Sequence, residues 1–347
     1  MSLNSFWFVL IAVLWIGYFI LEGFDFGVGI TLKLVAKDQA ERRAVITTLG
    51  PLWDGNEVWL LVAGGATFAA FPEWYATLFS GFYLPLFLIL LSLIVRGVAF
   101  EYRSKYGKAQ WRNRWDNAIV ISSAVPALLW GVAFANIVRG VPLQKSGKGV
   151  IEYVGGFFNL LNPYALLGGL VTLFLFATHG ALFLGLKTDG SIRKQANELA
   201  GKLGLVTAVL AVAFLSWTTF SLTSKTDVRM LSLAVVVFWV GTLAANRAGR
   251  EGVAFLTSSI TLALVVITLF AALYPNVMPS SLSPADSLNI FNASSTHYTL
   301  KVMTVVAVVM TPIVLIYQGW TYWVFRKRIS STHITSPEAG VLDKIHQ

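Results

Sequence analysis

Two carboxylic acids lie in an apolar run that is long enough to cross a bilayer. Asp54 and Glu57 belong to the segment Trp53-Asp54-Gly55-Asn56-Glu57-Val58-Trp59, and the apolar run covers residues 51–71. A charged side chain inside hydrocarbon costs at least a few kcal/mol, so acids placed there are functional candidates. The preceding apolar run carries a second pair, Glu22 and Asp25. We therefore expect a membrane protein that holds acids within the bilayer.

The spacing of the acids predicts a proton path. Glu22 and Asp25 are three residues apart, as are Asp54 and Glu57, so each pair shares one helix face. The two helices are consecutive and antiparallel, which favours contact between them. With Arg96 as a counter-charge, the four carboxyl groups form a chain leading inward from the cytoplasm. Closely spaced carboxylates cannot all ionise, and such chains relay protons.

Structural roles for the same residues stay open. Asp54 near a helix N-terminus is stabilised by the helix dipole, and Arg96 could serve only to neutralise one acid and hold helices together. Close helix packing accounts for the glycines of the first two apolar runs. Glu101 and Asp116 flank a polar loop and are expected to be solvated charges.

Histidine and cysteine usage argues against a haem or a metal held by this chain. There are no cysteines, which excludes iron–sulfur clusters and Cys-ligated zinc. His179 is the only histidine deep in a predicted span, so a bis-histidine haem is unsupported. A hydrogen-bonded packing role for His179 is favoured over an iron ligand. We assign no catalytic and no metal-ligating residue.

Composition indicates a single integral membrane domain of the all-α class. Hydrophobic residues make up 56 % of the 347 residues and charged residues 12 %, and the mean hydropathy is +0.69. Soluble domains carry about 25 % charged residues. The net charge of +9 reflects basic loops set by insertion topology and does not indicate a nucleic-acid partner. The apolar N-terminus is predicted to be a retained span and not a signal peptide.

About nine transmembrane helices are expected. Apolar runs of about 20 residues fall near residues 6–32, 51–71, 75–100, 117–139, 163–186, 203–223, 228–246, 253–274 and 298–325. Of the 26 Lys and Arg residues, 19 fall in alternate loops and the C-terminal tail and six on the opposite side. The bias places the N-terminus outside and the C-terminus in the cytoplasm. We expect a domain over residues 1–328 and a short cytoplasmic tail over 329–347.

Several motifs in order carry a family resemblance. The run Gly23-Phe24-Asp25-Phe26-Gly27-Val28-Gly29, followed by the Trp53–Trp59 segment, resembles subunit II of the cytochrome bd quinol oxidases. So do residues 63–66 (AGGA), 100–105 (FEYRSK) and 274–281 (YPNVMPSS). The similarity extends from the first predicted helix to Arg328.

The resemblance implies a function that the residues alone do not supply. Complexes of this family are in the bacterial plasma membrane, where they oxidise quinol, reduce O2 to water and take protons from the cytoplasm. It implies that haem b and haem d are held by a partner, subunit I, and none by this chain. It places Asp54 on a proton route and Trp59 beside an O2 passage, for which ordinary packing is the alternative. Some relatives have Gln at Glu57 and Asp at Glu22.

Other partners and other functions stay open at this point. The resemblance allows a structural quinone, a small single-helix subunit and membrane lipids as further partners. A proton-coupled secondary transporter is the alternative function, because buried acids suit it equally well. No internal repeat of the transporter kind is found. A purely structural scaffold subunit is the third alternative, in which the acids would not affect turnover.

Overall fold

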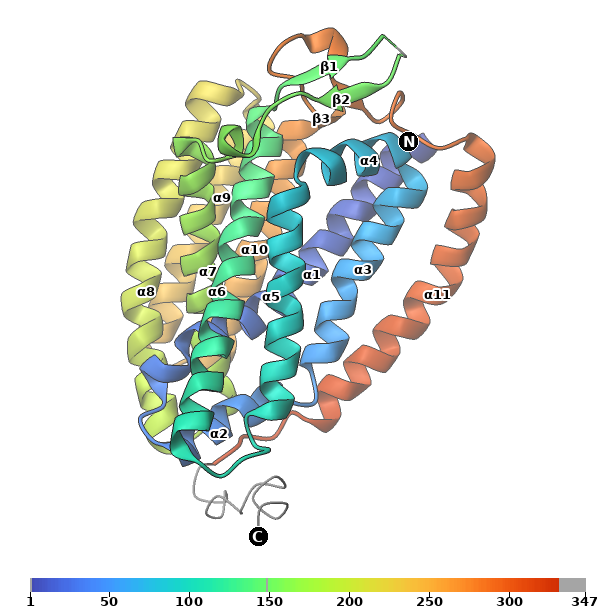
Figure 1. The fold of residues 1–347 in the computed structure, drawn as a ribbon. Coiled ribbons are helices and arrows are strands. Elements are labelled where there is room, and N and C mark those ends of the chain that lie inside the picture. The colour runs from blue at the N-terminus through green and yellow to red at the C-terminus, as the bar shows by residue number, and fades with distance from the viewer. Residues whose placement is uncertain (1, 148, 331–347) are drawn as a thin grey trace.

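The computed structural model describes residues 2–147 and 149–330 as a bundle of long helices (Figure 1). The helices are α1 (Leu3–Val35), α2 (Gln39–Leu49), α3 (Trp53–Ala70), α4 (Pro72–Gly81), α5 (Tyr83–Tyr102), α6 (Ala109–Arg139), α7 (Pro163–Lys187), α8 (Gly190–Trp217), α9 (Thr226–Arg247), α10 (Glu251–Leu273) and α11 (His297–Val324). Short helical turns are η1 (Phe157–Leu160), η2 (Thr218–Leu222) and η3 (Pro284–Asp286). The all-α membrane class expected from composition is confirmed.

Eight of the described helices are long and apolar enough to cross a membrane, one fewer than the nine predicted. The predicted run 51–71 corresponds to α3, which is not among the eight. Its 18 residues span about 27 Å, and they include Asp54, Asn56 and Glu57. Figure 1 nevertheless shows α3 running beside α1 through the bundle. Asp54, Asn56 and Glu57 lower the mean hydropathy of α3, which is why α3 is not among the eight.

The predicted span 75–100 is wrong as a single helix. The chain forms α4 and then α5, with Phe82 between them. Pro85 in the first turn of α5 has no N–H to donate, and its ring disfavours a helix that continues unbroken from the preceding turn. Figure 1 shows α4 crossing the upper end of the bundle, while α5 descends through it.

Two small hairpins lie at the upper end of Figure 1. Strand β1 (Leu143–Lys145) pairs with β2 (Ile151–Tyr153), and β3 (Asn276–Met278) pairs with β4 (Leu288–Asn289), both antiparallel. The Ser280 hydroxyl donates to the Leu143 carbonyl at 2.8 Å, which joins the two hairpins. As expected from its prolines, the loop after α10 is not helical throughout.

Helix α1 lies at the centre, and at Gly27 its backbone packs directly against the backbone of α7. A Cβ added at Gly27 would overlap the Phe176 carbonyl oxygen and the backbone of Gly180. Small residues allow this close approach in membrane helices. At Gly64 and Gly65 of α3, no atom of the described residues lies within 4 Å of an added Cβ. Close packing within the described part of this chain therefore does not account for these two glycines.

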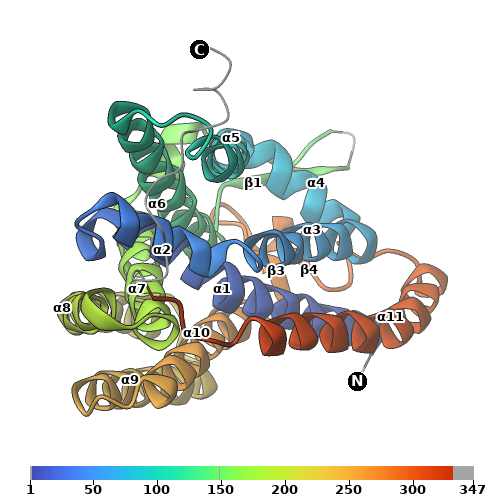
Figure 2. The same ribbon diagram turned by 90° about the horizontal axis from the view of Figure 1, so that it is seen from below.

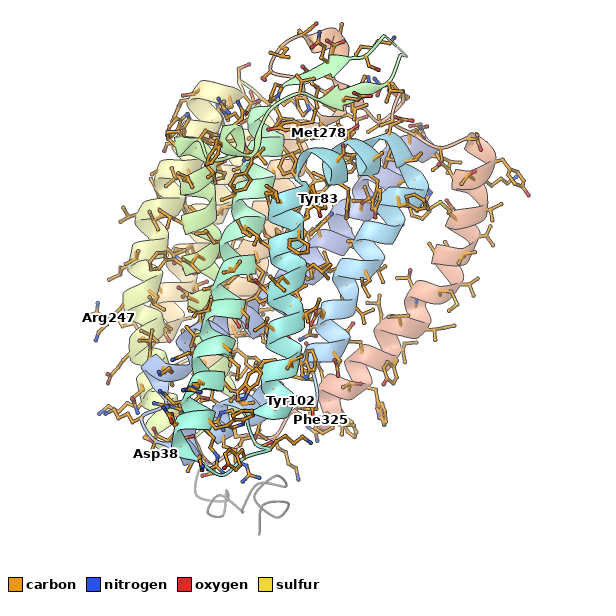
Figure 3. The ribbon with its side chains drawn as sticks, in the orientation of Figure 1. Asp38, Tyr83, Tyr102, Arg247, Met278 and Phe325 are labelled. Carbon is orange, nitrogen blue, oxygen red and sulfur yellow. The ribbon has the colours of Figure 1, made fainter. Side chains whose placement is uncertain are left out.

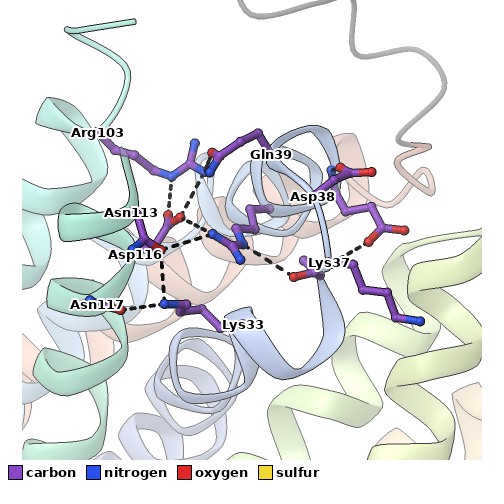
Figure 4. Close-up of polar contacts among 11 residues, drawn as sticks. Lys33, Lys37, Asp38, Gln39, Arg103, Asn113, Asp116 and Asn117 are labelled. Atoms are coloured by element: carbon purple, nitrogen blue, oxygen red, sulfur yellow. Dashed lines mark hydrogen bonds and ion pairs between the residues drawn. The ribbon is translucent and has the colours of Figure 1, made fainter. Parts of the chain in front are cut away.

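The lower end of the bundle is held by a polar cluster that joins α2, α5 and α6 (Figure 4). Asp116 is fully buried, with Arg103 Nε 2.5 Å and Arg42 Nη1 3.1 Å from its carboxylate oxygens. Arg103 also donates to the Gln39 side-chain oxygen at 2.8 Å. Asp116 is therefore a structural ion-pair centre, and its predicted role as a solvated charge is wrong. Glu101 is exposed.

Helix α11 lies at the edge of the bundle and is fastened mainly near its ends (Figure 2). Near its start, Trp7 Nε1 donates to the Leu300 carbonyl at 3.2 Å. Beyond its other end, Arg328 forms an ion pair with Glu251 at 2.6 Å. Figure 3 shows Phe325 at the same lower end as Asp38 and Tyr102, opposite Tyr83. Between these ends, most α11 side chains are exposed on the described chain.

The polar contacts at the lower end also gather the predicted basic loops at one end of the bundle. The segment after α1, the end of α5, the end of α7 and the residues after α11 meet there. Which side of the membrane this end faces stays a prediction, and we expect the cytoplasm. The tail predicted over residues 329–347 lies outside the described residues from 331 onward.

Candidate functional site

A buried ion pair between α1 and α5 is the centre of the candidate site. Arg96 Nη1 contacts Glu22 Oε1, and both side chains are fully inaccessible. Asp25, one turn further along α1, is also fully buried. Two acids with one arginine leave the cluster with more negative than positive charge if both are ionised. Buried charges are costly unless paired, and the described residues place one arginine beside these two acids.

Aromatic rings cover the guanidinium on two sides. Arg96 Cζ lies 4.9 Å from the ring centroid of Phe26 and 5.3 Å from that of Phe100. Such cation–π contacts stabilise a cation where water is absent. Four buried polar atoms make no hydrogen bond to any described residue: Glu22 Oε2, Asp25 Oδ1, Arg96 Nε and Arg96 Nη2. The cluster therefore retains free donor and acceptor capacity.

Asn56 of α3 connects this cluster to α11. Its side chain is fully buried, and its Nδ2 donates to Asp25 Oδ2 at 2.8 Å. Its Oδ1 accepts from the Tyr322 hydroxyl at 2.6 Å and from Gln318 Nε2 at 3.4 Å. The side chain thus uses both ends of its amide and joins three helices.

Trp59 of α3 is the first donor in a series of hydrogen bonds that leads through Gln318 to Asn56. Its indole N–H donates to Gln318 Oε1 at 2.8 Å. Its ring lies against Gly17 of α1, where an added Cβ would overlap it. Trp59 is half-buried. It is therefore both a packing residue and a hydrogen-bond donor to α11.

The remaining predicted acids lie further from the buried centre. Glu57 is half-buried, and Arg96 and Asp54 are among the charged groups that act on it. Asp54 is exposed on the described chain, and Glu101 is its charged neighbour. The structure therefore brings Glu22, Asp25 and Arg96 together, with Glu57 beside them and Asp54 toward the surface.

His179 is separate from the acids. Its Nε2 donates to the Ile20 carbonyl oxygen at 3.1 Å, because a carbonyl can only accept. Its Nδ1 lies 2.8 Å from the Ser258 hydroxyl, which also lies 2.8 Å from the Phe255 carbonyl oxygen. The imidazole stacks on Phe255 at 4.7 Å between centroids. Since both ring nitrogens are engaged, His179 does not fit the role of a haem ligand in this conformation.

A large apolar cavity lies toward the upper end, between α3, α4, α5 and α6. Its volume is about 470 Å³, and Gly64, Gly65 and Trp130 are among its lining residues. Trp74, also on its wall, is only 2 % exposed, and its indole N–H has no partner among the described residues. The cavity thus offers an apolar volume with the Trp74 indole in its wall.

Comparison with known proteins decides the family. The chain matches the family described as "Cytochrome bd terminal oxidase subunit II" over residues 3–325. The chain belongs to this family. It is 41 % identical to "Cytochrome bd ubiquinol oxidase subunit 2" of Bacillus subtilis (strain 168), covering 95 % of this chain and 97 % of that protein. It is 38 % identical to "Cytochrome bd-I ubiquinol oxidase subunit 2" of Escherichia coli (strain K12), covering 96 % of each.

One solved structure of a bd oxidase has the same fold as this chain. A chain in "The structure of bd oxidase from Geobacillus thermodenitrificans" has a TM-score of 0.76 at 18 % identity, covering 94 % of this chain and 100 % of that one. The expected membership and the location in the bacterial cytoplasmic membrane are thus confirmed. The transporter alternative finds no support in these comparisons.

Membership in subunit II of a cytochrome bd oxidase has two direct consequences. The chain is one subunit of an oxidoreductase complex, so at least one partner subunit is implied. The complex contains haems. Within residues 2–147 and 149–330, no group of three or more His, Cys, Asp or Glu could hold a metal ion.

Sequence reasoning missed three of the residues that shape this subunit II site. Asn56, Gln318 and Tyr322 are polar groups in apolar runs, and Gln318 and Tyr322 are four residues apart on one helix face. That spacing on an otherwise apolar helix was an available signal. The partner helix could not be inferred, because Asn56 and Gln318 are 262 residues apart in the chain.

Proposed function

We propose that this subunit II supplies a proton route for O2 reduction in the oxidase complex. The supporting observation is the graded burial of its acids: exposed Asp54, half-buried Glu57, then fully buried Glu22 and Asp25 beside Arg96. Carboxyl groups arranged in this way can pass a proton inward while Arg96 limits the charge that accumulates. Asp54 is then the entry group, and Arg96 is the counter-charge.

Substitution of the entry acid tests this route. In the purified oxidase complex, Asp54→Asn is expected to slow quinol-driven O2 uptake by about tenfold, the factor for a barrier higher by about 1.4 kcal/mol. The haem content, measured by the reduced-minus-oxidised spectrum, is expected to stay at the wild-type level. Glu101→Gln, an exposed neighbour, is the matched control. Loss of haem together with activity would assign Asp54 to assembly instead, and full activity would support the scaffold alternative.

We propose that haem b and haem d belong to the partner, subunit I. The engagement of both His179 nitrogens by Ile20 and Ser258 supports this division. Trp59 is proposed to border the path by which O2 reaches the haem, and its half-buried ring on α3 is compatible with that position. A small single-helix subunit and membrane lipids are further proposed partners, and the exposed apolar side chains of α5 and α11 offer surfaces for them.

A structural quinone is proposed for the cavity between α3, α4, α5 and α6. Its apolar wall suits a prenylated ring, and the free Trp74 N–H suits a quinone carbonyl oxygen. The ubiquinol in the names of the relatives makes a quinone available to such a complex. The role proposed for this molecule is structural, separate from the substrate quinol.

Extraction of quinone from the purified complex tests this site. Trp74→Phe keeps the ring but removes the donor, and is expected to lower the quinone recovered per haem by at least about half, the effect of losing a buried hydrogen bond worth about 1 kcal/mol. Trp111→Phe, whose indole donates to the Tyr102 carbonyl at the other end of the bundle, is the control. Equal quinone in the wild type and Trp74→Phe would remove Trp74 from the site.

A further inference from the structure

The hydrogen bonds between Trp59 and Asp25 have only one allowed direction. An indole N–H can donate but cannot accept. Trp59 therefore requires Gln318 to present its oxygen, Oε1, at 2.8 Å. The other end of the Gln318 amide is Nε2, which can only donate, so the Asn56 atom facing it at 3.4 Å must be Oδ1. The orientation of one amide is thus fixed by the next.

A second group, the Tyr322 hydroxyl, contacts the same Asn56 oxygen but does not fix its orientation, because a hydroxyl both donates and accepts. The Tyr322 hydroxyl donates to Asn56 Oδ1 at 2.6 Å, the shorter of the two contacts at this atom. Nδ2 is then left for Asp25 Oδ2 at 2.8 Å, with the Leu21 carbonyl at 3.5 Å as its second acceptor. Every donor at Asn56 has an acceptor, and reversing the amide would place two donors against each other. Helix α11 therefore controls the side of Asn56 that Asp25 meets.

The result at Asp25 is that its two oxygens are not equivalent. Oδ2 faces an N–H group and must accept, so it cannot carry a hydrogen-bonded proton toward Asn56. Oδ1 is buried and has no partner among the described residues. The charged and titratable groups acting near Asp25 are Glu22 on α1, Glu57 on α3, Arg96 on α5 and Tyr322 on α11.

We infer that Trp59, Gln318 and Asn56 form a polarity lock, in which the fixed donor on Oδ2 confines proton gain and loss at Asp25 to Oδ1. The O–H bond forms at Oδ1 when a proton arrives and breaks there when it leaves. Asn56 is then a positioning residue for Asp25, and Gln318 acts through it. This inference rests on the proposed proton route through Asp25.

The difference between the two contacts at Asn56 gives the lock a distinctive signature. Gln318→Met removes the donor of fixed polarity, so Asn56 can turn its oxygen toward Asp25 while its nitrogen donates to the Tyr322 hydroxyl. Tyr322→Phe leaves Gln318 to hold the amide. The effect on Asp25 should therefore follow Gln318→Met, whereas a merely structural contribution would follow the loss of either contact.

The experiment is infrared titration of the purified complex, with the protonated-carboxyl band of Asp25 assigned by its loss in Asp25→Asn. Gln318→Met is expected to shift the band and move its titration midpoint upward by about one pH unit, the effect of one lost hydrogen bond to the charged form. Tyr322→Phe should move it far less. Tyr317→Phe is the matched control, because Tyr317 is exposed on the same helix.

The outcomes separate the lock from the proton route. Equal shifts in Gln318→Met and Tyr322→Phe, an unchanged band in Gln318→Met, or no band lost in Asp25→Asn at any pH would overturn the lock. Wild-type O2 uptake in Asp25→Asn would instead refute the route while leaving the infrared result valid. If Gln318→Met does not assemble, Asn56→Ser serves, since a hydroxyl has no fixed polarity. It is expected to produce the same shift, and an unshifted band would again overturn the lock.

Discussion

Replacing Arg96 by Met is expected to prevent accumulation of the assembled oxidase. Arg96 is the partner of Glu22 in a pair where both side chains are fully inaccessible, and it lies over the rings of Phe26 and Phe100. Removing one member of a buried pair leaves an uncompensated charge and costs about 3–5 kcal/mol. The measurement is the yield of haem-bearing complex in mild detergent, together with its thermal unfolding midpoint.

The companion variants identify the cause of the Arg96 effect. Glu22→Gln in the same chain as Arg96→Met removes the orphaned charge, so it is expected to restore much of the yield. Arg96→Lys keeps the charge but loses the planar group between the rings, and should fall between the wild type and Arg96→Met. Full stability of Arg96→Met alone would mean that Glu22 is protonated in the folded complex and needs no counter-charge.

Adding a single methyl group at Gly27 is expected to have a comparably large effect. The new Cβ would overlap the Phe176 carbonyl oxygen and the Gly180 backbone, and backbone cannot move aside as a flexible side chain can. Helices α1 and α7 would have to separate, at a cost at or above about 3 kcal/mol, the upper part of the range for overpacked cores. The thermal unfolding midpoint of the complex measures this cost.

Gly241→Ala in α9 is the matched control for Gly27→Ala. Both glycines lie inside long apolar helices, so the intrinsic helix preference gained from Ala is the same, about 1 kcal/mol or less. No atom of the described residues lies within 4 Å of a Cβ at Gly241, so this variant is expected to be as stable as the wild type or slightly more stable. Equal destabilisation by the two substitutions would show that close packing of α1 on α7 is not the reason.

Both predictions concern the packing of α1, since Gly27 lies on α1 and Arg96 of α5 pairs with Glu22 of α1. This packing explains how the site is built. The close contact of α1 with α7 at Gly27 fixes the rotation of α1, which carries Glu22 and Asp25 toward α3 and α5. Arg96 then reaches Glu22 from α5, and Asn56 reaches Asp25 from α3. Gly27 lies in the same family motif as Asp25. Its close packing on α7 thus allows Glu22 and Asp25 to be buried together.

Predictions that depended on local sequence failed where tertiary contacts changed the environment. Asp116 follows a basic loop and looks solvated, yet Arg42 and Arg103 enclose it from two other helices. Gly64 and Gly65 look like packing glycines, yet they line a cavity. In each case, the residue type was compatible with either environment, and only the position of distant helices decided between them.

The sequence by itself determined the membrane class, most of the spans, the family and the acids of the candidate site, because hydropathy, motif order and three-residue spacing are local properties. The roles of those acids stay predictions. Only the tertiary structure decided that Glu22 pairs with Arg96, that α4 and α5 are separate, and that α11 reaches Asn56 through Gln318 and Tyr322. Those contacts depend on the rotation and tilt of each helix, which are fixed by packing against helices far away in the chain.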